Sequence, residues 1–168
     1  MPKIILFVTD NTDKVFDNEN ICCYMVADDL LPSKIKEIID TKKMVLSIGK
    51  SAFDVCKQYN LDGVVKEIDV NKPIKIQLKS LRENLKGKTL GVIIPARRHE
   101  AMLAGEIEPE FIAFYSNNKE TDQQIIDWYN ELFLMPAAWV IKNNEYKEEI
   151  SDVDFVIIQA KNFENFGC

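Results

Sequence analysis

The stretch that decides the fold is "LGVIIPARRHEAMLAGEIEPEFIAFY", residues 90–115. Its two ends, residues 90–95 and 111–115, are short and nearly continuous apolar runs. Such runs are typical of parallel strands that are buried on both faces. Residues 98–108 between them have the spacing of an amphipathic helix, which we expect Pro109 to end because proline disfavours helical geometry in the residue before it. The stretch therefore predicts a strand, a helix and a second strand.

The same alternation of apolar runs and helical patterns covers the rest of the chain. The eight expected strands are residues 3–9, 21–27, 44–48, 62–67, 90–95, 111–115, 137–141 and 154–158. Ser51 and Thr121 each begin a capping-box pattern, and Asn143 or Asn144 could cap a short helix before the last strand. Strands that alternate with helices imply parallel β-α units.

Eight strands predict a (β/α)8 TIM barrel, with residues 1–168 forming one domain without repeats or linkers. Such barrels usually contain about 250 residues, so this one must be trimmed. The segment "DNTDKVFDNEN", residues 10–20, has little apolar periodicity, and we expect the first helix to be short or missing there. The alternative is an open doubly wound parallel sheet, in which one or two of the expected strands would be absent.

The composition excludes several classes of protein. The formal net charge of −6 disfavours a nucleic-acid partner, and no apolar run approaches the roughly 18 residues of a membrane span. The N-terminus lacks the pattern of a secretory signal. The four cysteines form no C-x-x-C pair and there is one histidine, so we expect no metal cluster and a reducing, cytoplasmic location.

The candidate site begins where the expected strand 90–95 ends. Arg97, Arg98 and His99 follow a strand's carboxyl end and also start a helix. Ligand sites of parallel α/β proteins form at such ends, and guanidinium groups beside free backbone N–H groups suit a phosphate or carboxylate. The alternative is that these cations only decorate a helix start. No serine or cysteine nucleophile lies nearby in the sequence, so a catalytic triad is unsupported.

Two segments, one of them inside the stretch quoted above, carry a resemblance to a known family. "RHEAMLAGE" (98–106) and "DWYNELFLMP" (127–136) resemble thiamine phosphate synthase and its TenI relatives, in particular a divergent bacterial branch. The resemblance covers about residues 43–160, and the first 40 residues only by strand order. It implies a TIM barrel and a reaction that joins hydroxymethylpyrimidine pyrophosphate to thiazole phosphate, with Mg²⁺ assisting the departure of pyrophosphate.

The residues that the resemblance places in the site are degenerate. Gly49 and Lys50 stand where the family has Asn-Asp, and Asp28 and Asp29 stand where it has cations for pyrophosphate. The chain also lacks any Gly-Gly or G-x-G sequence, which makes a close backbone approach to phosphate harder. The remaining phosphate-binding candidates are Arg97, Arg98, His99, Ser116, Lys119 and Lys142, and the metal candidates are Asp10 and Asp28.

Three functions remain open. The chain could be an active, divergent synthase that uses Mg²⁺. It could be a pseudoenzyme that binds a phosphorylated, thiamine-related small molecule without turnover, which the loss of motif residues favours. It could also be an interaction protein that forms a homo-oligomer through the aromatic segment around Trp128, Tyr129, Phe133 and Trp139.

Overall fold

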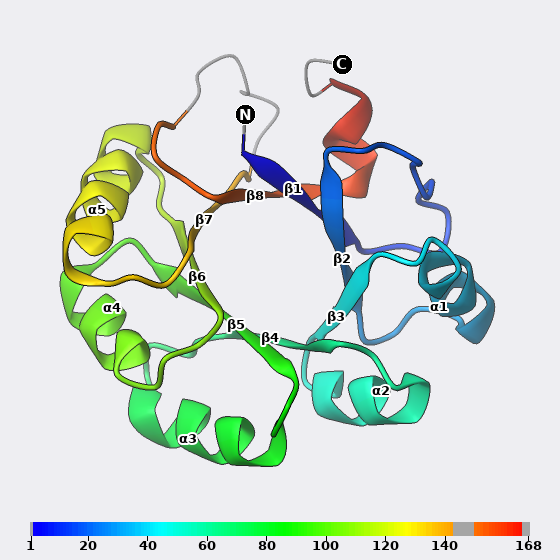
Figure 1. Cartoon of the computed structure of the whole chain (residues 1–168), viewed down its shortest axis with the longest axis horizontal. Helices are drawn as coiled ribbons and strands as arrows, with labels where there is room; N and C mark the ends of the chain where they lie inside the picture. Colours follow the sequence, from blue (N-terminus) through cyan, green and yellow to red (C-terminus); the bar gives the residue numbers. More distant parts are fainter. Residues whose placement is uncertain (1, 143–149, 166–168) are drawn as a thin grey trace.

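Eight parallel strands close into a barrel in the computed structural model, which describes residues 2–142 and 150–165 (Figure 1). Each strand pairs with the next along the chain, and the last pairs with the first. The strands are β1 (Lys3–Val8), β2 (Ile21–Ala27), β3 (Met44–Ile48), β4 (Gly63–Glu67), β5 (Thr89–Pro95), β6 (Phe111–Tyr115), β7 (Ala137–Val140) and β8 (Phe155–Gln159). The TIM barrel is confirmed, and the open sheet is wrong because β1 and β8 are hydrogen-bonded to each other.

The helices lie outside the ring, between consecutive strands (Figure 1). They are α1 (Pro32–Ile39), α2 (Ala52–Tyr59), α3 (Ile74–Asn84), α4 (Arg98–Gly105) and α5 (Lys119–Leu132), with a 3₁₀ helix, η1 (Ala160–Asn165), after β8. The short helix expected from Asn143 or Asn144 lies outside the described residues. Within residues 2–142 and 150–165, every helix is too short or too polar to cross a bilayer.

The trimmed part of the barrel is the connection between β1 and β2. Residues 9–20 form turns and extended chain with no helix, as the sequence indicates. The ring of Phe16 in this connection lies 4.7 Å from the ring of Phe163 in η1, and the Tyr24 hydroxyl donates to the Phe16 carbonyl at 2.5 Å. The loop thus packs against the 3₁₀ helix, which itself contacts β1 and β8.

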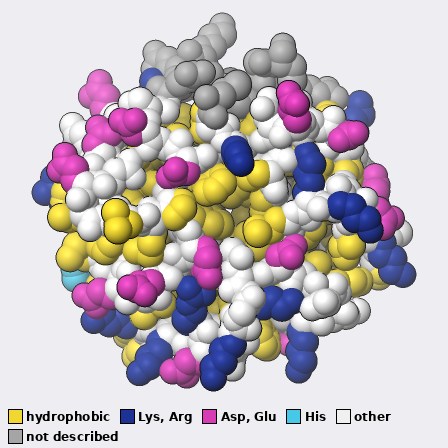
Figure 2. Space-filling view, in the orientation of Figure 1, with side chains coloured by type: hydrophobic (Ala, Val, Ile, Leu, Met, Phe, Trp, Pro, Cys, Tyr) yellow, Lys and Arg dark blue, Asp and Glu magenta, His cyan; other side chains and the backbone are white. Residues whose placement is uncertain are grey.

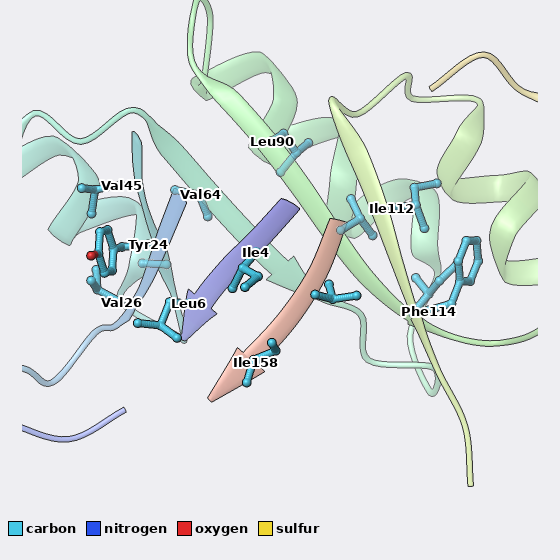
Figure 3. Packing of buried hydrophobic residues seen from close by; sticks show 14 of the residues in the cluster. Ile4, Leu6, Tyr24, Val26, Val45, Val64, Leu90, Ile112, Phe114 and Ile158 are labelled. Carbon is cyan, nitrogen blue, oxygen red and sulfur yellow. The ribbon is translucent and has the colours of Figure 1, made fainter. Parts of the chain in front are cut away.

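Two apolar layers explain why the strands are apolar on both faces. Ile4, Leu6 and Val8 of β1 belong to an outer layer that packs beneath the helices, and Figure 3 shows Ile4 and Leu6 beside Ile158 of β8. Ile5 and Phe7 of the same strand belong to a second cluster, which fills the barrel interior. Alternate residues of a strand point to opposite faces, so a strand between two apolar layers must be apolar throughout.

Helix α4 is shorter than expected and ends at Gly105 rather than at residue 108. The chain then turns, and Glu108 takes a left-handed conformation with φ of 54° before Pro109. A Cβ atom at Gly105 would lie 2.5 Å from the ring of Phe133, so only glycine lets α4 pack this closely on the segment after α5. The glycine in the "RHEAMLAGE" segment therefore has a packing role.

Both expected capping boxes are wrong. The Ser51 side chain caps nothing, and its backbone N–H instead donates to the Asp28 carboxylate at 2.7 Å. Helix α5 begins earlier than expected, with Asn118 accepting from the backbone N–H of Thr121 at 3.1 Å. The first error arises because a residue distant in sequence supplies the acceptor, and the second because an asparagine upstream is itself a strong N-cap.

Charged side chains of both signs are mixed on the face shown in Figure 2. Hydrophobic side chains occupy the centre of this face, and lysine, arginine, aspartate and glutamate side chains surround them. This face therefore carries no continuous basic stripe of the kind that tracks a nucleic-acid backbone.

Candidate functional site

The carboxyl ends of the eight strands meet around a cavity of about 320 Å³ inside the barrel. We call this cavity the barrel mouth. Its walls are mainly apolar side chains from β1, β2, β3, β5, β7 and β8, and its polar side chains are Glu67, Tyr115, Lys142 and Gln159. Ligand sites of TIM barrels form at this end, and small-molecule sites typically combine apolar walls with a few polar groups.

The polar side chains reach the mouth because of their positions on the strands. Glu67, Tyr115 and Gln159 are the last residues of β4, β6 and β8, and Lys142 lies two residues beyond the end of β7. Val65 lies two residues before Glu67 and faces the barrel interior. Side chains repeat their direction every two residues, so Glu67 also faces inward but at the open end of the barrel.

Lys142 and Tyr115 are in direct contact. The Lys142 Nζ atom lies 3.7 Å from the centroid of the Tyr115 ring, which is a cation–π distance. Burial raises the pKa of the Tyr115 hydroxyl above its ordinary value, and the negative charge of Glu67 raises it further, while Arg97 opposes this. Tyr115 is therefore a neutral hydroxyl at pH 7, within electrostatic reach of both Glu67 and Arg97.

The structure separates the arginine–histidine cluster from the cavity. Arg97 is exposed and its guanidinium lies 3.6 Å from the Glu100 carboxylate. The Arg98 guanidinium lies 5.4 Å from the Trp128 ring centre on α5, and His99 is exposed on α4. None of the three lines the cavity. Because α4 begins at Arg98, the helical rotation spreads neighbouring side chains around the helix, and Arg97 acts electrostatically on Tyr115 of the barrel mouth.

Ser116 and Lys119 follow the end of β6, in the turn before α5 and at its first position. The Ser116 hydroxyl donates to the Asn118 carbonyl at 2.8 Å and accepts from the Asn118 backbone N–H at 3.0 Å. Lys119 is the first residue of α5. Neither side chain lines the cavity, so Lys142 is the one sequence-derived phosphate candidate among the cavity-lining residues that the structure describes.

Asp10 and Asp28 are occupied with local hydrogen bonds. The Asp10 carboxylate accepts from the Thr12 backbone N–H at 2.8 Å and from the Thr12 hydroxyl at 2.9 Å, and these bonds lower its pKa. The Asp28 carboxylate accepts from Ser51 and lies over Gly49, where a Cβ atom would approach it to 2.4 Å. The described residues contain no group of three histidine, cysteine, aspartate or glutamate side chains that could hold a metal ion. This donor set does not fit Mg²⁺, and we derive no step through it.

Three polar residues of the mouth, Glu67, Tyr115 and Gln159, were not among the phosphate and metal candidates from sequence. Tyr115 and Gln159 are the final residues of β6 and β8 and face the cavity. The available signal was a polar residue at the end of an apolar run, two positions beyond an interior residue such as Ala113. That signal becomes usable only once the inward and outward positions of each strand are assigned.

The fold and the mouth define the class of this protein as a TIM barrel. A solved structure of tryptophan synthase from M. tuberculosis, in an open form, superposes with a TM-score of 0.66 at 7% sequence identity. The match covers 95% of this chain and 83% of that chain. Likeness at this level of identity shows the shared fold alone. No family model matches the sequence, and no curated protein matches it.

Proposed function

We propose that this TIM barrel binds a small anionic molecule with an apolar body at the barrel mouth. The observation that carries the proposal is the 320 Å³ cavity, which combines mainly apolar walls with the exposed side chain of Lys142 at its rim. Apolar walls favour a ring or hydrocarbon body, and a lysine ammonium suits a phosphate or carboxylate. A charge-assisted hydrogen bond of this kind contributes about 1.5–3 kcal/mol.

The resemblance to thiamine phosphate synthase narrows the proposal to a phosphorylated, thiamine-related compound. It is supported by "RHEAMLAGE" and "DWYNELFLMP" on a barrel of the fold that the resemblance implies. Gly49 and Lys50 replace the family's Asn-Asp pair, and the carboxylates of Asp10 and Asp28 are occupied locally. We therefore propose a catalytically impaired homologue that binds its ligand without turnover.

Thermal unfolding with added ligand tests this proposal. We expect thiamine phosphate or thiazole phosphate, at about 100 times its Kd, to stabilise the chain by about 2.7 kcal/mol. For a chain of this size, that corresponds to a rise in Tm of roughly 5–10 °C. Pyrophosphate, which lacks an apolar body, should give a smaller shift. No shift with any of the three compounds contradicts the proposal.

A turnover assay separates the impaired homologue from an active synthase. We expect no thiamine phosphate from hydroxymethylpyrimidine pyrophosphate and thiazole phosphate, even at high protein concentration and with Mg²⁺ present. Product that disappears in Lys142→Gln but persists in Arg98→Gln would instead establish an active enzyme that uses the barrel mouth.

The oligomeric alternative rests on a different set of side chains from the one the sequence indicates. Tyr129 is buried and offers no surface to a partner, and the half-buried Trp139 uses its Nε1–H to donate to Asp122 at 2.9 Å. Leu132 and Leu134 are instead exposed, at 57% and 105%. A homo-oligomer through these leucines would dissociate in Leu134→Glu, and light scattering that finds the unmodified chain monomeric contradicts this alternative.

A further inference from the structure

Two opposite charges line the barrel mouth without neutralising each other. Glu67 extends from the end of β4 and Lys142 from beyond the end of β7, and both line the cavity. Among the ion pairs of the described residues, neither side chain takes part. Lys142 lies on the ring of Tyr115, and the charge of Glu67 acts on the hydroxyl of the same tyrosine.

This arrangement disfavours a ligand that carries negative charge alone. An anionic group would gain from Lys142 but would be repelled by the Glu67 carboxylate. Glu67 and Lys142 are both exposed at the rim of the mouth, so the attraction and the repulsion act on the same bound group with comparable, solvent-screened strength. A ligand with an ammonium or N–H donor at its other end would pair with Glu67 and turn the repulsion into attraction.

We propose that the barrel mouth selects dipolar ligands, in which Lys142 holds an anionic group, Glu67 holds an amine, and an apolar ring between them lies against the cavity walls. This inference rests on the proposed function and specifies its ligand class. Lys142 lies on the Tyr115 ring, and Tyr115 also lines the cavity with a neutral hydroxyl, which can donate to the anion or accept from the amine. Glu67 thus acts as a specificity-determining residue rather than as a metal ligand.

A matched pair of synthetic probes tests the inference on the full chain by calorimetry. The probes are 4-(aminomethyl)benzylphosphonate and 4-methylbenzylphosphonate, which share the ring and the anion but differ in the amine. We expect the amine-bearing probe to bind at least about tenfold more tightly, as a charge-assisted hydrogen bond implies. This comparison uses the unmodified chain and so does not depend on the folding of any variant.

Substitutions then assign the preference to its residue. In Glu67→Gln the preference should fall to within about twofold, while 4-methylbenzylphosphonate should bind as tightly as before or more tightly. Glu37→Gln on α1 makes the same change of charge outside the cavity, and it should keep the full preference. Lys142→Gln should weaken the binding of both probes.

The outcomes distinguish this inference from the function on which it rests. Equal affinity for both probes, or a preference that survives Glu67→Gln, overturns dipolar selection. If 4-methylbenzylphosphonate still binds in a Lys142-dependent way, the anion-binding function stands. If neither probe binds, both the inference and the proposed function are overturned.

Discussion

At the scale of single residues, the Lys142 ammonium group can exchange its contact with the Tyr115 ring for a hydrogen bond to a bound anion. Its ammonium group lies on the Tyr115 ring, a contact that contributes about 0.5–1 kcal/mol at an exposed site. A charge-assisted hydrogen bond to a phosphate is stronger, at about 1.5–3 kcal/mol. An incoming anion can therefore draw Lys142 off the ring at little cost, and the exposed ring face can then receive the body of the ligand.

Arg98 shows why a sequence cluster need not be a site. The sequence places Arg97, Arg98 and His99 together, but consecutive residues at a helix start point in different directions. Arg98 turns to the ring of Trp128, which is thirty positions away in the sequence. The sequence could predict that two arginines follow a strand. It could not predict where their side chains point, because that depends on the first residue of α4 and on the aromatic ring beside it.

Tyr129 gives a residue-scale prediction about stability. Its hydroxyl is buried, and no described residue offers it a hydrogen-bond partner. A buried hydroxyl without a partner costs about 1–3 kcal/mol, so we expect Tyr129→Phe to raise the free energy of unfolding by about 1 kcal/mol. Urea unfolding monitored by circular dichroism measures this change, and a loss of stability in Tyr129→Phe would contradict it.

The same substitution should change the response to alkaline pH. Burial raises the pKa of Tyr129 in the folded chain above its ordinary value near 10. Folding therefore favours the neutral hydroxyl over the charged one. Ionisation of this tyrosine does not affect the free energy of unfolding below about pH 10, and it lowers that free energy as the pH rises above this value. Tyr129→Phe should lose less stability than the unmodified chain between pH 9 and pH 11.

At the scale of secondary-structure elements, the strands follow directly from the sequence. Each expected strand lies within one residue of its observed bounds, because burial on both faces requires apolar residues throughout. Helix starts were less predictable. The N-terminus of α2 is capped by Asp28 from the end of β2, and no pattern local to Ser51 could reveal that partner.

The bond between α5 and β7 gives an element-scale prediction. Trp139 donates to the buried carboxylate of Asp122, whose second oxygen has no partner among the described residues. Trp139→Phe would leave this carboxylate unpaired, and we expect a loss of about 1–3 kcal/mol in the free energy of unfolding. Asp122→Asn removes the charge but keeps an acceptor, so it should cost less than Trp139→Phe. Chemical denaturation of both variants makes the comparison, and the reverse order would contradict it.

At the scale of the whole molecule, barrel closure creates the mouth. Glu67, Tyr115, Lys142 and Gln159 lie far apart in the sequence and come together only because eight strands end at one rim. The sequence could predict the eight strands and the missing first helix. It could not predict which strand-end residues face inward, since that depends on the strand register around the closed ring.

The stability of the trimmed barrel depends on η1, which packs against β1 and β8 and against the loop between β1 and β2. Phe163 of η1 is buried and lies against Phe16 of the loop that replaces the first helix. We expect Phe163→Ala to cost about 3–5 kcal/mol, which is typical of a large aromatic residue removed from a core. Phe163→Leu should cost distinctly less. If equilibrium unfolding shows both variants to be as stable as the unmodified chain, η1 is not part of the barrel's core.

The most direct test of the central claim is a calorimetric titration of thiamine phosphate, which carries both a phosphate and an amino group, into the unmodified chain, Lys142→Gln and Arg98→Gln. Lys142 lines the barrel mouth, whereas Arg98 lies against Trp128 outside it. The loss of a charge-assisted hydrogen bond predicts that Lys142→Gln raises the Kd by about 10–100-fold, while Arg98→Gln leaves it within about twofold. A Kd that rises in Arg98→Gln and is unchanged in Lys142→Gln would contradict the claim that the mouth is the ligand site.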